Sequence, residues 1–360
     1  MKELIIGGLK IPFPIIQGGM GVGISLSKLA VAVANEGGVG VISSAGIGLL
    51  YKDPSKDYYQ SSIIGFKEEI RKAMDKTRGV IGVNIMTALT NFEDMVRTAI
   101  EEKVNIIFSG AGLPLDLPKF LKPDSVTKLV PIVSSGKAAR LICEKWKMKF
   151  DYLPDAFVVE GPKAGGHLGF KSNQINDENY SLEKLVPEVV EAVKAFEEKY
   201  NQEIPVIAAG GIYNGEDMYN IMQKGAKGVQ LGTRFVTTVE CDASEEFKQE
   251  YIHAQENEIE IIQSPVGMPG RAIKNSFIQK VNDGLKMPKS CPFKCIKTCE
   301  VEKSPYCIIT ALFNAYKGNM NGGFAFAGSN AFKATHISTV KEIFSEMIND
   351  FNLKVKNVKL

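Results

Sequence analysis

Residues 205–235 read PVIAAGGIYNGEDMYNIMQKGAKGVQLGTRF, and this stretch decides the fold. Two apolar runs, at 205–209 and 228–231, flank an amphipathic stretch, and a glycine follows each run. Apolar runs without polar alternation are typical of parallel strands that are covered on both faces. The stretch therefore predicts a strand–helix–strand unit with a glycine turn after each strand.

The same unit recurs along the first 235 residues. The clearest helix is predicted at 182–200, where one apolar stripe lies opposite Glu and Lys. Eight alternations of strand and helix favour a closed (β/α)8 TIM barrel, and an open doubly wound sheet is the structural alternative. The predicted strands are 13–17, 38–42, 80–84, 105–108, 129–133, 156–160, 205–209 and 228–231, with further helices at 26–36, 92–103, 138–147 and 216–224.

Two segments fall outside these units. Residues 47–65 follow the second predicted strand and carry three tyrosines, which predicts an excursion over one face of the barrel. Residues 257–360 form a C-terminal extension that we expect to pack on a barrel of residues 1–256. The extension contains a cysteine-rich segment at 291–307 and a predicted final helix at about 340–350.

The bulk composition is that of a globular protein with a large core. The hydrophobic fraction of 44% and the charged fraction of 23% are ordinary, and the net charge of +2 predicts no nucleic-acid or membrane partner. No apolar run reaches the roughly 18 residues of a transmembrane helix. Six cysteines without an export signal are expected to be reduced thiols or metal ligands. The sequence thus predicts a cytoplasmic enzyme with a small-molecule substrate, and it leaves a homodimer open.

Glycines after the last two strands predict an anion site. Gly210 and Gly211 follow the seventh strand, and Gly232 and Thr233 follow the eighth. In a TIM barrel these two loops commonly bind phosphate through backbone N–H groups, which glycine leaves accessible. Turns without a ligand are the alternative. A sugar phosphate, pyridoxal phosphate or a nucleotide would fit equally well.

His167 is the best catalytic candidate in the sequence. It lies between glycines in the loop after the sixth strand, where no apolar helix face needs it. Its ordinary pKa near neutrality suits proton transfer at the end of the barrel where active sites form. His253 and His336, the other two histidines, are expected at the surface. At the same end, Asn84 and the glycine-rich turn 17–21 are candidates to approach a ligand closely.

Five motifs occur in order along the chain: QGGMG at 17–21, GVNI at 82–85, EGxxAGGHxG at 160–169, AAGGI at 208–212 and GVQLGTRF at 228–235. Together they resemble the nitronate monooxygenase (2-nitropropane dioxygenase) family, which includes similar FMN-dependent enoyl-acyl-carrier-protein reductases. The resemblance spans about residues 10–280, and segment 323–331 is also similar. It implies an FMN-binding barrel with His167 as the catalytic histidine and with cofactor contacts from Gly19, Met20, Gly21, Asn84, Ser134, Glu160, Gly165, Gly166, Gly210, Gly211, Gln230, Gly232 and Thr233.

The resemblance leaves two reactions open. A nitronate monooxygenase oxidises an alkyl nitronate with O2 to a carbonyl compound and nitrite, without NAD(P)H. An enoyl reductase uses NAD(P)H to reduce the flavin and then an enoyl thioester. Segment 264–271, SPVGMPGR, resembles the nitronate-oxidising members, so the first reaction is the preferred hypothesis.

The cysteine-rich segment supports a third hypothesis, an electron-transfer or redox-sensing flavoprotein. Its spacing is C-x3-C-x3-C-x7-C. Thiolates of this kind bind zinc or an iron–sulfur cluster, although the spacing is not the C-x2-C of zinc ribbons or bacterial ferredoxins. Four reduced thiols without a metal are the alternative. The candidate ligands are Cys291, Cys295, Cys299 and Cys307.

Overall fold

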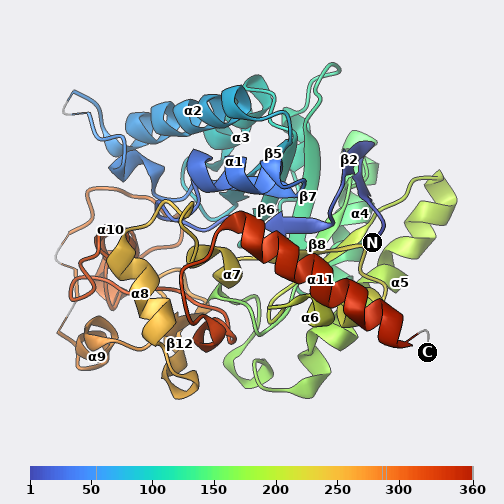
Figure 1. Cartoon of the computed structure of the whole chain (residues 1–360). Helices are drawn as coiled ribbons and strands as arrows, with labels where there is room; N and C mark the ends of the chain where they lie inside the picture. Colours follow the sequence, from blue (N-terminus) through green and yellow to red (C-terminus); the bar gives the residue numbers. More distant parts are fainter. Residues whose placement is uncertain (54, 286, 289, 359–360) are drawn as a thin grey trace.

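A computed structural model describes residues 1–53, 55–285, 287–288 and 290–358, and it contains the predicted closed barrel (Figure 1). Eight parallel strands pair in chain order, and the last strand returns to pair with the first. The closed ring confirms the TIM barrel and excludes the open sheet. The strands are β3 (Ile15–Gln17), β4 (Val39–Ser43), β5 (Val80–Met86), β6 (Ile106–Gly110), β7 (Lys128–Val133), β8 (Phe157–Glu160), β10 (Val206–Ala209) and β11 (Gly228–Leu231).

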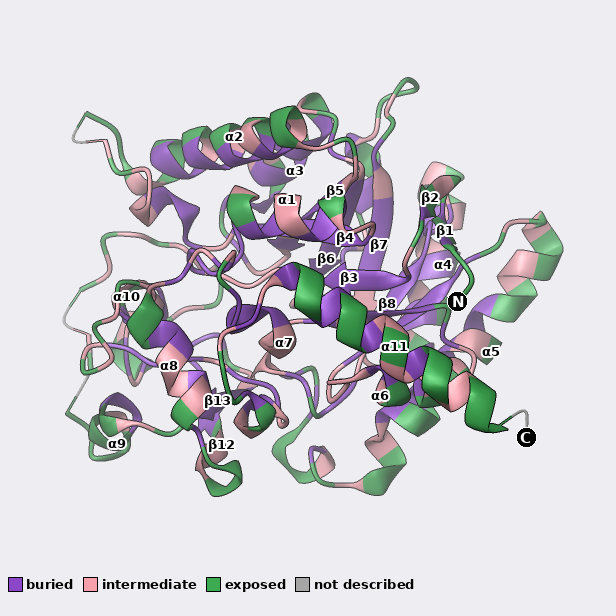
Figure 2. Ribbon diagram, in the orientation of Figure 1, coloured by how far each residue is buried: buried purple, intermediate pink, exposed green. Residues whose placement is uncertain are grey.

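Helices alternate with these strands as predicted, except between β6 and β7, where a 3-10 helix (Leu117–Phe120) replaces an α-helix; the helices bury one face against the barrel (Figure 2). No helix in the described part of the chain is long and apolar enough to cross a bilayer. The barrel helices are α1 (Ser27–Asn35), α2 (Tyr58–Lys76), α3 (Phe92–Glu101), α4 (Gly136–Phe150), α5 (Leu182–Tyr200), α6 (Gly215–Met222) and the short α7 (Thr233–Val236).

The prediction of an excursion over residues 47–65 is wrong in its second half. Tyr58 begins helix α2, which lies between β4 and β5 in the chain and is one of the barrel helices. The Asp57 side chain caps this helix by accepting a hydrogen bond from the Gln60 N–H at 2.8 Å. Phe66 and Ile70, four residues apart, are fully buried on its inner face. The helix begins with Tyr58 and Tyr59, which were interpreted as part of a loop, so the apolar stripe that follows was not recognised.

A short hairpin closes one end of the barrel. Strands β1 (Leu4–Ile6) and β2 (Leu9–Ile11) pair in antiparallel fashion around Gly7 and Gly8, which both have positive φ angles. Their inward side chains belong to the same apolar cluster as the interior of the barrel. Figure 1 shows this hairpin at the end of the barrel opposite α8, α9 and α10. Three-residue strands carry too little pattern to be predicted from the sequence.

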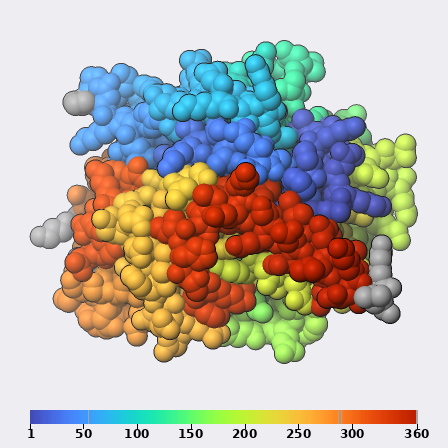
Figure 3. Space-filling model, in the orientation of Figure 1, coloured from blue at the N-terminus to red at the C-terminus, as the bar shows by residue number. Residues whose placement is uncertain are grey.

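The C-terminal part of the chain covers the other end of the barrel (Figure 3). A three-stranded sheet joins β12 (Ile259–Gln263) and β13 (Pro269–Ile273) to β9 (Gly166–His167) from the barrel loops. The predicted final helix is present and longer than expected. The helices here are α8 (Glu245–His253), α9 (Ser276–Asn282), α10 (Ile308–Tyr316) and α11 (Val340–Val358).

Helix α11 returns from this end to the barrel wall, where it packs against α6 and contacts α1. Its Phe344 is buried and lies edge-on to Phe13 at a ring-centroid distance of 6.3 Å. We propose the division at residue 256 as a domain description, with α11 as the part of the extension that completes the ring of helices.

Candidate active site

One cavity of about 800 Å³ lies at the carboxyl ends of the barrel strands, under the extension. Its size falls in the range of about 300–1,000 Å³ that is typical of ligand sites. The structure brings all fourteen predicted catalytic and cofactor residues to its wall, although they come from eight separate segments. They are Gly19, Met20, Gly21, Asn84, Ser134, Glu160, Gly165, Gly166, His167, Gly210, Gly211, Gln230, Gly232 and Thr233.

The loop after β10 can be built only with glycine. Gly210 and Gly211 have φ angles of +98° and +82°, which L side chains rarely adopt. A Cβ on Gly210 would lie 2.9 Å from the Gly161 carbonyl oxygen, and one on Gly211 would lie 2.9 Å from the Lys163 Cβ. The bare backbone of this loop therefore faces the cavity directly.

The extension supplies a part of the site that the sequence did not assign. Gly328 N–H donates to the Thr233 hydroxyl at 2.9 Å, and the Asn330 amide donates to the Gly211 carbonyl at 2.6 Å. Between them, Ser329 N–H donates to the Lys163 carbonyl at 3.1 Å. The segment is thus tied to the loops after β8, β10 and β11.

Ser329 also carries an unsatisfied group. Its hydroxyl oxygen is buried and has no hydrogen-bond partner among the described residues, and the residue lines the cavity. A buried hydroxyl without a partner costs free energy, so such a group normally faces a ligand or water. Ser329 lies beside Lys163, which adjoins Gly211, so its hydroxyl is placed near the glycine loop after β10.

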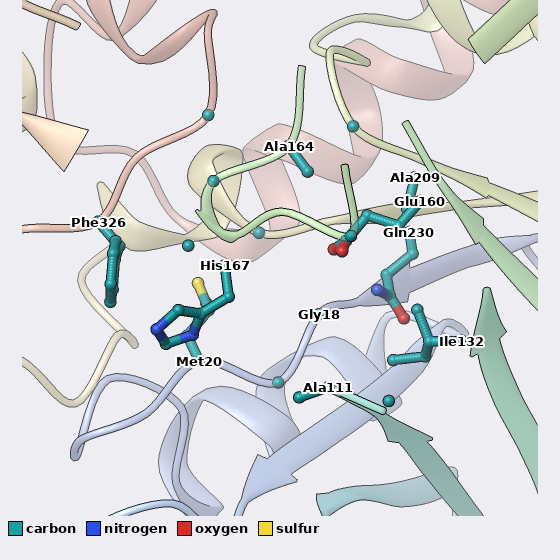
Figure 4. Close-up of a pocket in the computed structure, with 18 of the residues that line it drawn as sticks. Gly18, Met20, Ala111, Ile132, Glu160, Ala164, His167, Ala209, Gln230 and Phe326 are labelled. Carbon is teal, nitrogen blue, oxygen red and sulfur yellow. The ribbon is translucent and has the colours of Figure 1, made fainter. Parts of the chain in front are cut away.

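His167 lines the same cavity and lies on strand β9. The strand pairs with β13, so that His167 lies opposite Gly270 of the extension. Its Nε2 is 2.7 Å from the Ser264 hydroxyl, and its ring lies edge-on to Phe326 at a centroid distance of 5.0 Å (Figure 4). Nδ1 has no hydrogen-bond partner within the described residues, so it is the nitrogen left for a ligand.

The protonation of this pair follows from its surroundings. Burial lowers the pKa of His167 to about 4, so the imidazole is neutral near pH 7. Ser264 accepts a hydrogen bond from the Val266 N–H at 3.3 Å, which leaves its own hydroxyl hydrogen free to donate to Nε2. In that arrangement the proton of the neutral ring is on Nδ1, which becomes a donor toward the cavity.

A second titratable group lines the same cavity. Burial raises the pKa of Glu160, at the end of β8, to about 7. Figure 4 shows Glu160 and Gln230 on one side of the cavity and His167 with Phe326 on the other. The site therefore carries two groups whose pKa values burial has moved in opposite directions.

Arg271 holds the loop that carries His167. Its side chain is only 6% exposed, and its guanidinium Nη1 donates to the Ala164 carbonyl at 2.8 Å and to the Pro162 carbonyl. A charged donor with two backbone acceptors fixes this loop firmly. The sequence included Arg271 in a motif of the extension but gave it no role.

Glycine also permits close packing beneath the cavity floor. A Cβ on Gly19 would lie 2.2 Å from the Asn84 Cβ, so the turn after β3 packs against the end of β5. Another part of the wall is apolar, and one of its side chains, Phe326, packs against the His167 ring. Its side chains include Met86, Leu113, Val266, Met268, Leu312 and Phe326.

The other predicted groups lie outside the cavity wall. His253 and His336 are exposed, as expected. The cysteines at 291–307 are free and partly buried, and Thr298, next to Cys299, reaches the cavity rim. Among the described residues, no group of three or more His, Cys, Asp and Glu side chains could hold a metal ion, so the structure does not support the cysteines at 291–307 as metal ligands.

Comparisons with known proteins identify the family of this chain. The model of the nitronate monooxygenase family matches residues 2–350. A probable nitronate monooxygenase of Staphylococcus aureus is 30% identical over 307 residues, which cover 78% of this chain and 81% of the relative.

Solved structures share the whole architecture. FabK of Thermotoga maritima is 28% identical with a TM-score of 0.73, and the match covers 97% of this chain and 96% of FabK. A nitroalkane oxidase of Streptomyces ansochromogenes has a TM-score of 0.74 over 97% of this chain and 98% of that enzyme. At 21% identity, it is a likeness of fold alone. Because the family model spans nearly all of the sequence, the chain belongs to the nitronate monooxygenase family of oxidoreductases.

Proposed function

We propose that this protein is an FMN-dependent oxidoreductase that oxidises alkyl nitronates with O2 to a carbonyl compound and nitrite. One observation carries the proposal: the glycines after β10 and β11, the unpartnered Ser329 hydroxyl and a neutral His167 line the same cavity. The match to the nitronate monooxygenase family and the similarity to the probable nitronate monooxygenase of S. aureus support the same substrate class.

The residues present fit the phosphate of FMN. Gly210, Gly211 and Gly232 leave backbone groups accessible, and the Ser329 hydroxyl is a buried donor without another partner. The Thr233 hydroxyl accepts from Gly328 and can donate its own hydrogen to an anion. We propose that these residues hold the phosphate.

The other candidates line the same cavity, and we propose that they contact the rest of FMN. They are Gly19, Met20, Gly21, Asn84, Ser134, Glu160, Gly165, Gly166 and Gln230.

FMN bound in this cavity would supply the redox chemistry. The chain itself binds and orients the substrate. A nitronate is already an anion, so its oxidation needs no strong base, and a neutral imidazole with a low pKa suits a hydrogen-bonding role better than proton abstraction. The Nδ1–H of His167 would donate to a nitronate oxygen, with Ser264 fixing the tautomer from Nε2. The adjoining apolar wall excludes water from the reacting carbon.

An anaerobic reduction experiment tests the reaction class. The purified flavoprotein is mixed first with NADH or NADPH and then with a nitronate, while the visible absorbance of the flavin is followed. We expect no bleaching by either nucleotide and reduction by the nitronate. Rapid bleaching by a nucleotide, with no reduction by the nitronate, would refute the nitronate proposal.

The role of His167 is tested by replacement with alanine. His167→Ala should keep FMN bound, because it removes none of the groups proposed to hold the phosphate, and turnover should fall about 10- to 100-fold for a lost hydrogen bond to an anion. Ser264→Ala, which removes only the partner of Nε2, should have a smaller effect in the same direction. Unchanged kinetics in His167→Ala would remove this residue from the proposed role.

The apolar wall supports a second candidate, an NAD(P)H-dependent reductase of enoyl thioesters. Met86, Leu113, Met268 and Leu312 could accommodate an acyl chain beside His167. Bleaching by NADPH followed by reoxidation with an enoyl thioester would favour this reaction over nitronate oxidation. The cytoplasmic location and the homodimer expected from the sequence stay predictions.

A further inference from the structure

Helix α1 begins directly after a loop that lines the large cavity. The loop comprises residues 18–24, and five of its residues reach the cavity wall: Gly18, Gly19, Met20, Gly21 and Ile24. Ser25 joins this loop to the helix. Its hydroxyl accepts a hydrogen bond from the Met20 N–H at 2.8 Å, and its N–H donates to the Met20 carbonyl at 3.1 Å. The conformation of the loop is therefore tied to the start of α1.

Helix α1 has no cap in its own sequence. Leu26 precedes the helix with a side chain that cannot accept a hydrogen bond, and residues 27–30 include no acid. The first N–H groups of a helix need acceptors, and negative charge stabilises that end. The acceptors for α1 must therefore come from other parts of the chain.

Two carboxylates that are distant in the sequence supply these acceptors. Glu69, on the neighbouring helix α2 (Figure 1), accepts a hydrogen bond from the Ser27 N–H at 2.7 Å. Asp242, 216 residues after Leu26, accepts through Oδ2 from the Leu26 N–H at 2.9 Å and from the Leu29 N–H at 3.3 Å. Hydrogen bonds to a charged acceptor are stronger than those between neutral groups, so the two carboxylates fix the first turn of α1.

Asp242 also holds the end of the loop. Its own N–H donates to the Ile24 carbonyl at 3.3 Å, and the thiol of the neighbouring Cys241 donates to the same carbonyl at 3.4 Å. One residue thus binds the last residue of the loop and the first turn of the helix together. Asp242 follows α7, which begins at Thr233 of the proposed phosphate site. The segment from Thr233 to Asp242 therefore connects the loop after β11 with the loop after β3.

We propose that Asp242 is a positioning residue for FMN, which acts through the loop at 18–24 and not by contact with the cofactor. Asp242 is not among the described residues that line the cavity, whereas the loop supplies three proposed FMN contacts, Gly19, Met20 and Gly21. A loop that already has its bound conformation saves the free energy of ordering when the ligand binds. This inference rests on FMN as the proposed cofactor and is independent of the nitronate substrate.

The affinity for FMN tests the proposal, measured by quenching of FMN fluorescence on titration with the FMN-free protein. Burial raises the pKa of Asp242 to about 6, so the titration is done near pH 8, where the carboxylate is ionised. In Asp242→Ala the N–H groups of Leu26 and Leu29 lose their acceptor, and the Kd of FMN should rise about 10- to 100-fold. Asp242→Asn keeps an oxygen that can accept these hydrogen bonds and should recover most of the affinity.

The matched control is Asp57→Ala, which removes the side-chain cap of α2 at Gln60 in place of that of α1. Both alanine variants should lower the thermal midpoint of the FMN-free protein, but only Asp242→Ala should weaken FMN binding. An unchanged Kd in Asp242→Ala would overturn this inference alone, and so would an equal loss of affinity in Asp57→Ala. If the wild-type protein itself binds no FMN, the proposed cofactor is refuted together with this inference.

Hydrogen exchange of the wild-type protein is a second measurement that needs no variant. The amides of Leu26 and Leu29 should be protected in the FMN-free protein, because Asp242 holds them before the cofactor arrives. Rapid exchange of both amides that slows only when FMN is added would show that the cofactor, and not Asp242, orders this part of the chain.

Discussion

His167 and Glu160 allow a quantitative test of the cavity, because burial has shifted their pKa values in opposite directions. The pKa of His167 is lowered from 6.5 to about 4, and that of Glu160 is raised from 4.5 to about 7. The test replaces each group with glutamine, which is uncharged at every pH used. Stability is then measured in the FMN-free protein, so that ligand binding does not add to it.

The two effects have opposite signs. The folded chain binds a proton at His167 less readily than the unfolded chain. The contribution of neutral His167 to the free energy of unfolding is therefore fully present above pH 6.5 and is lost as the pH falls toward 4. The folded chain binds a proton at Glu160 more readily than the unfolded chain. Ionising the buried carboxyl above pH 7 therefore lowers the free energy of unfolding, and this penalty disappears as the pH falls toward 4.5. Between pH 7.5 and pH 5.0 each effect amounts to about 2 kcal/mol.

Urea unfolding at pH 7.5 and pH 5.0 measures both effects. In the wild-type protein the contributions of the two groups nearly cancel. Relative to the wild-type change, acidification should stabilise His167→Gln by about 2 kcal/mol and destabilise Glu160→Gln by about 2 kcal/mol. All other titrating groups are common to the three proteins and drop out of the differences. The same pH dependence in all three proteins would show that neither side chain is buried as the structure has it.

Three further substitutions test the walls of the cavity. Gly211→Asp should abolish stoichiometric FMN binding in a folded protein, because a carboxylate would face the phosphate at a backbone φ of +82°; dialysis and absorbance measure it. Ser329→Ala should weaken FMN binding about tenfold with kcat little changed, and an unaltered Kd would separate Ser329 from the phosphate. Arg271→Met leaves the Pro162 and Ala164 carbonyls without their charged donor, so the free energy of unfolding should fall by about 2–3 kcal/mol in urea titrations.

The barrel and much of the site could be predicted because their signals are local. A buried parallel strand is a continuous apolar run, and all eight runs became strands within two residues of the predicted bounds. The glycines at 210 and 211 predicted a backbone open to a ligand, and their positive φ angles are ones that only glycine adopts freely. His167 could be predicted as a catalytic candidate because glycines flank it and it does not belong to the apolar face of a helix.

The missed residues act across long sequence separations. Ser264 is 97 residues from the histidine that it contacts, and Arg271 is 107 residues from the Ala164 carbonyl. Ser329 faces loops that lie more than 90 residues earlier in the chain. No periodicity or spacing links such pairs, so only the folded chain reveals them. Strands β1 and β2 were missed for a related reason. Each has only three residues, and their position is set by contact with the apolar interior of the barrel that they close.

The position of His167 depends on the extension as much as on the barrel. Strand β9 has its only strand partner, within the described chain, in β13 of the extension, and Ser264 orients the ring from the turn before β13. The proposed anion site depends on the extension in the same way, through Ser329 and its neighbours. Residues 257–360 therefore complete both ends of the cavity. A substitution that loosens the extension should impair substrate and FMN binding together, even where the eight-stranded barrel remains folded.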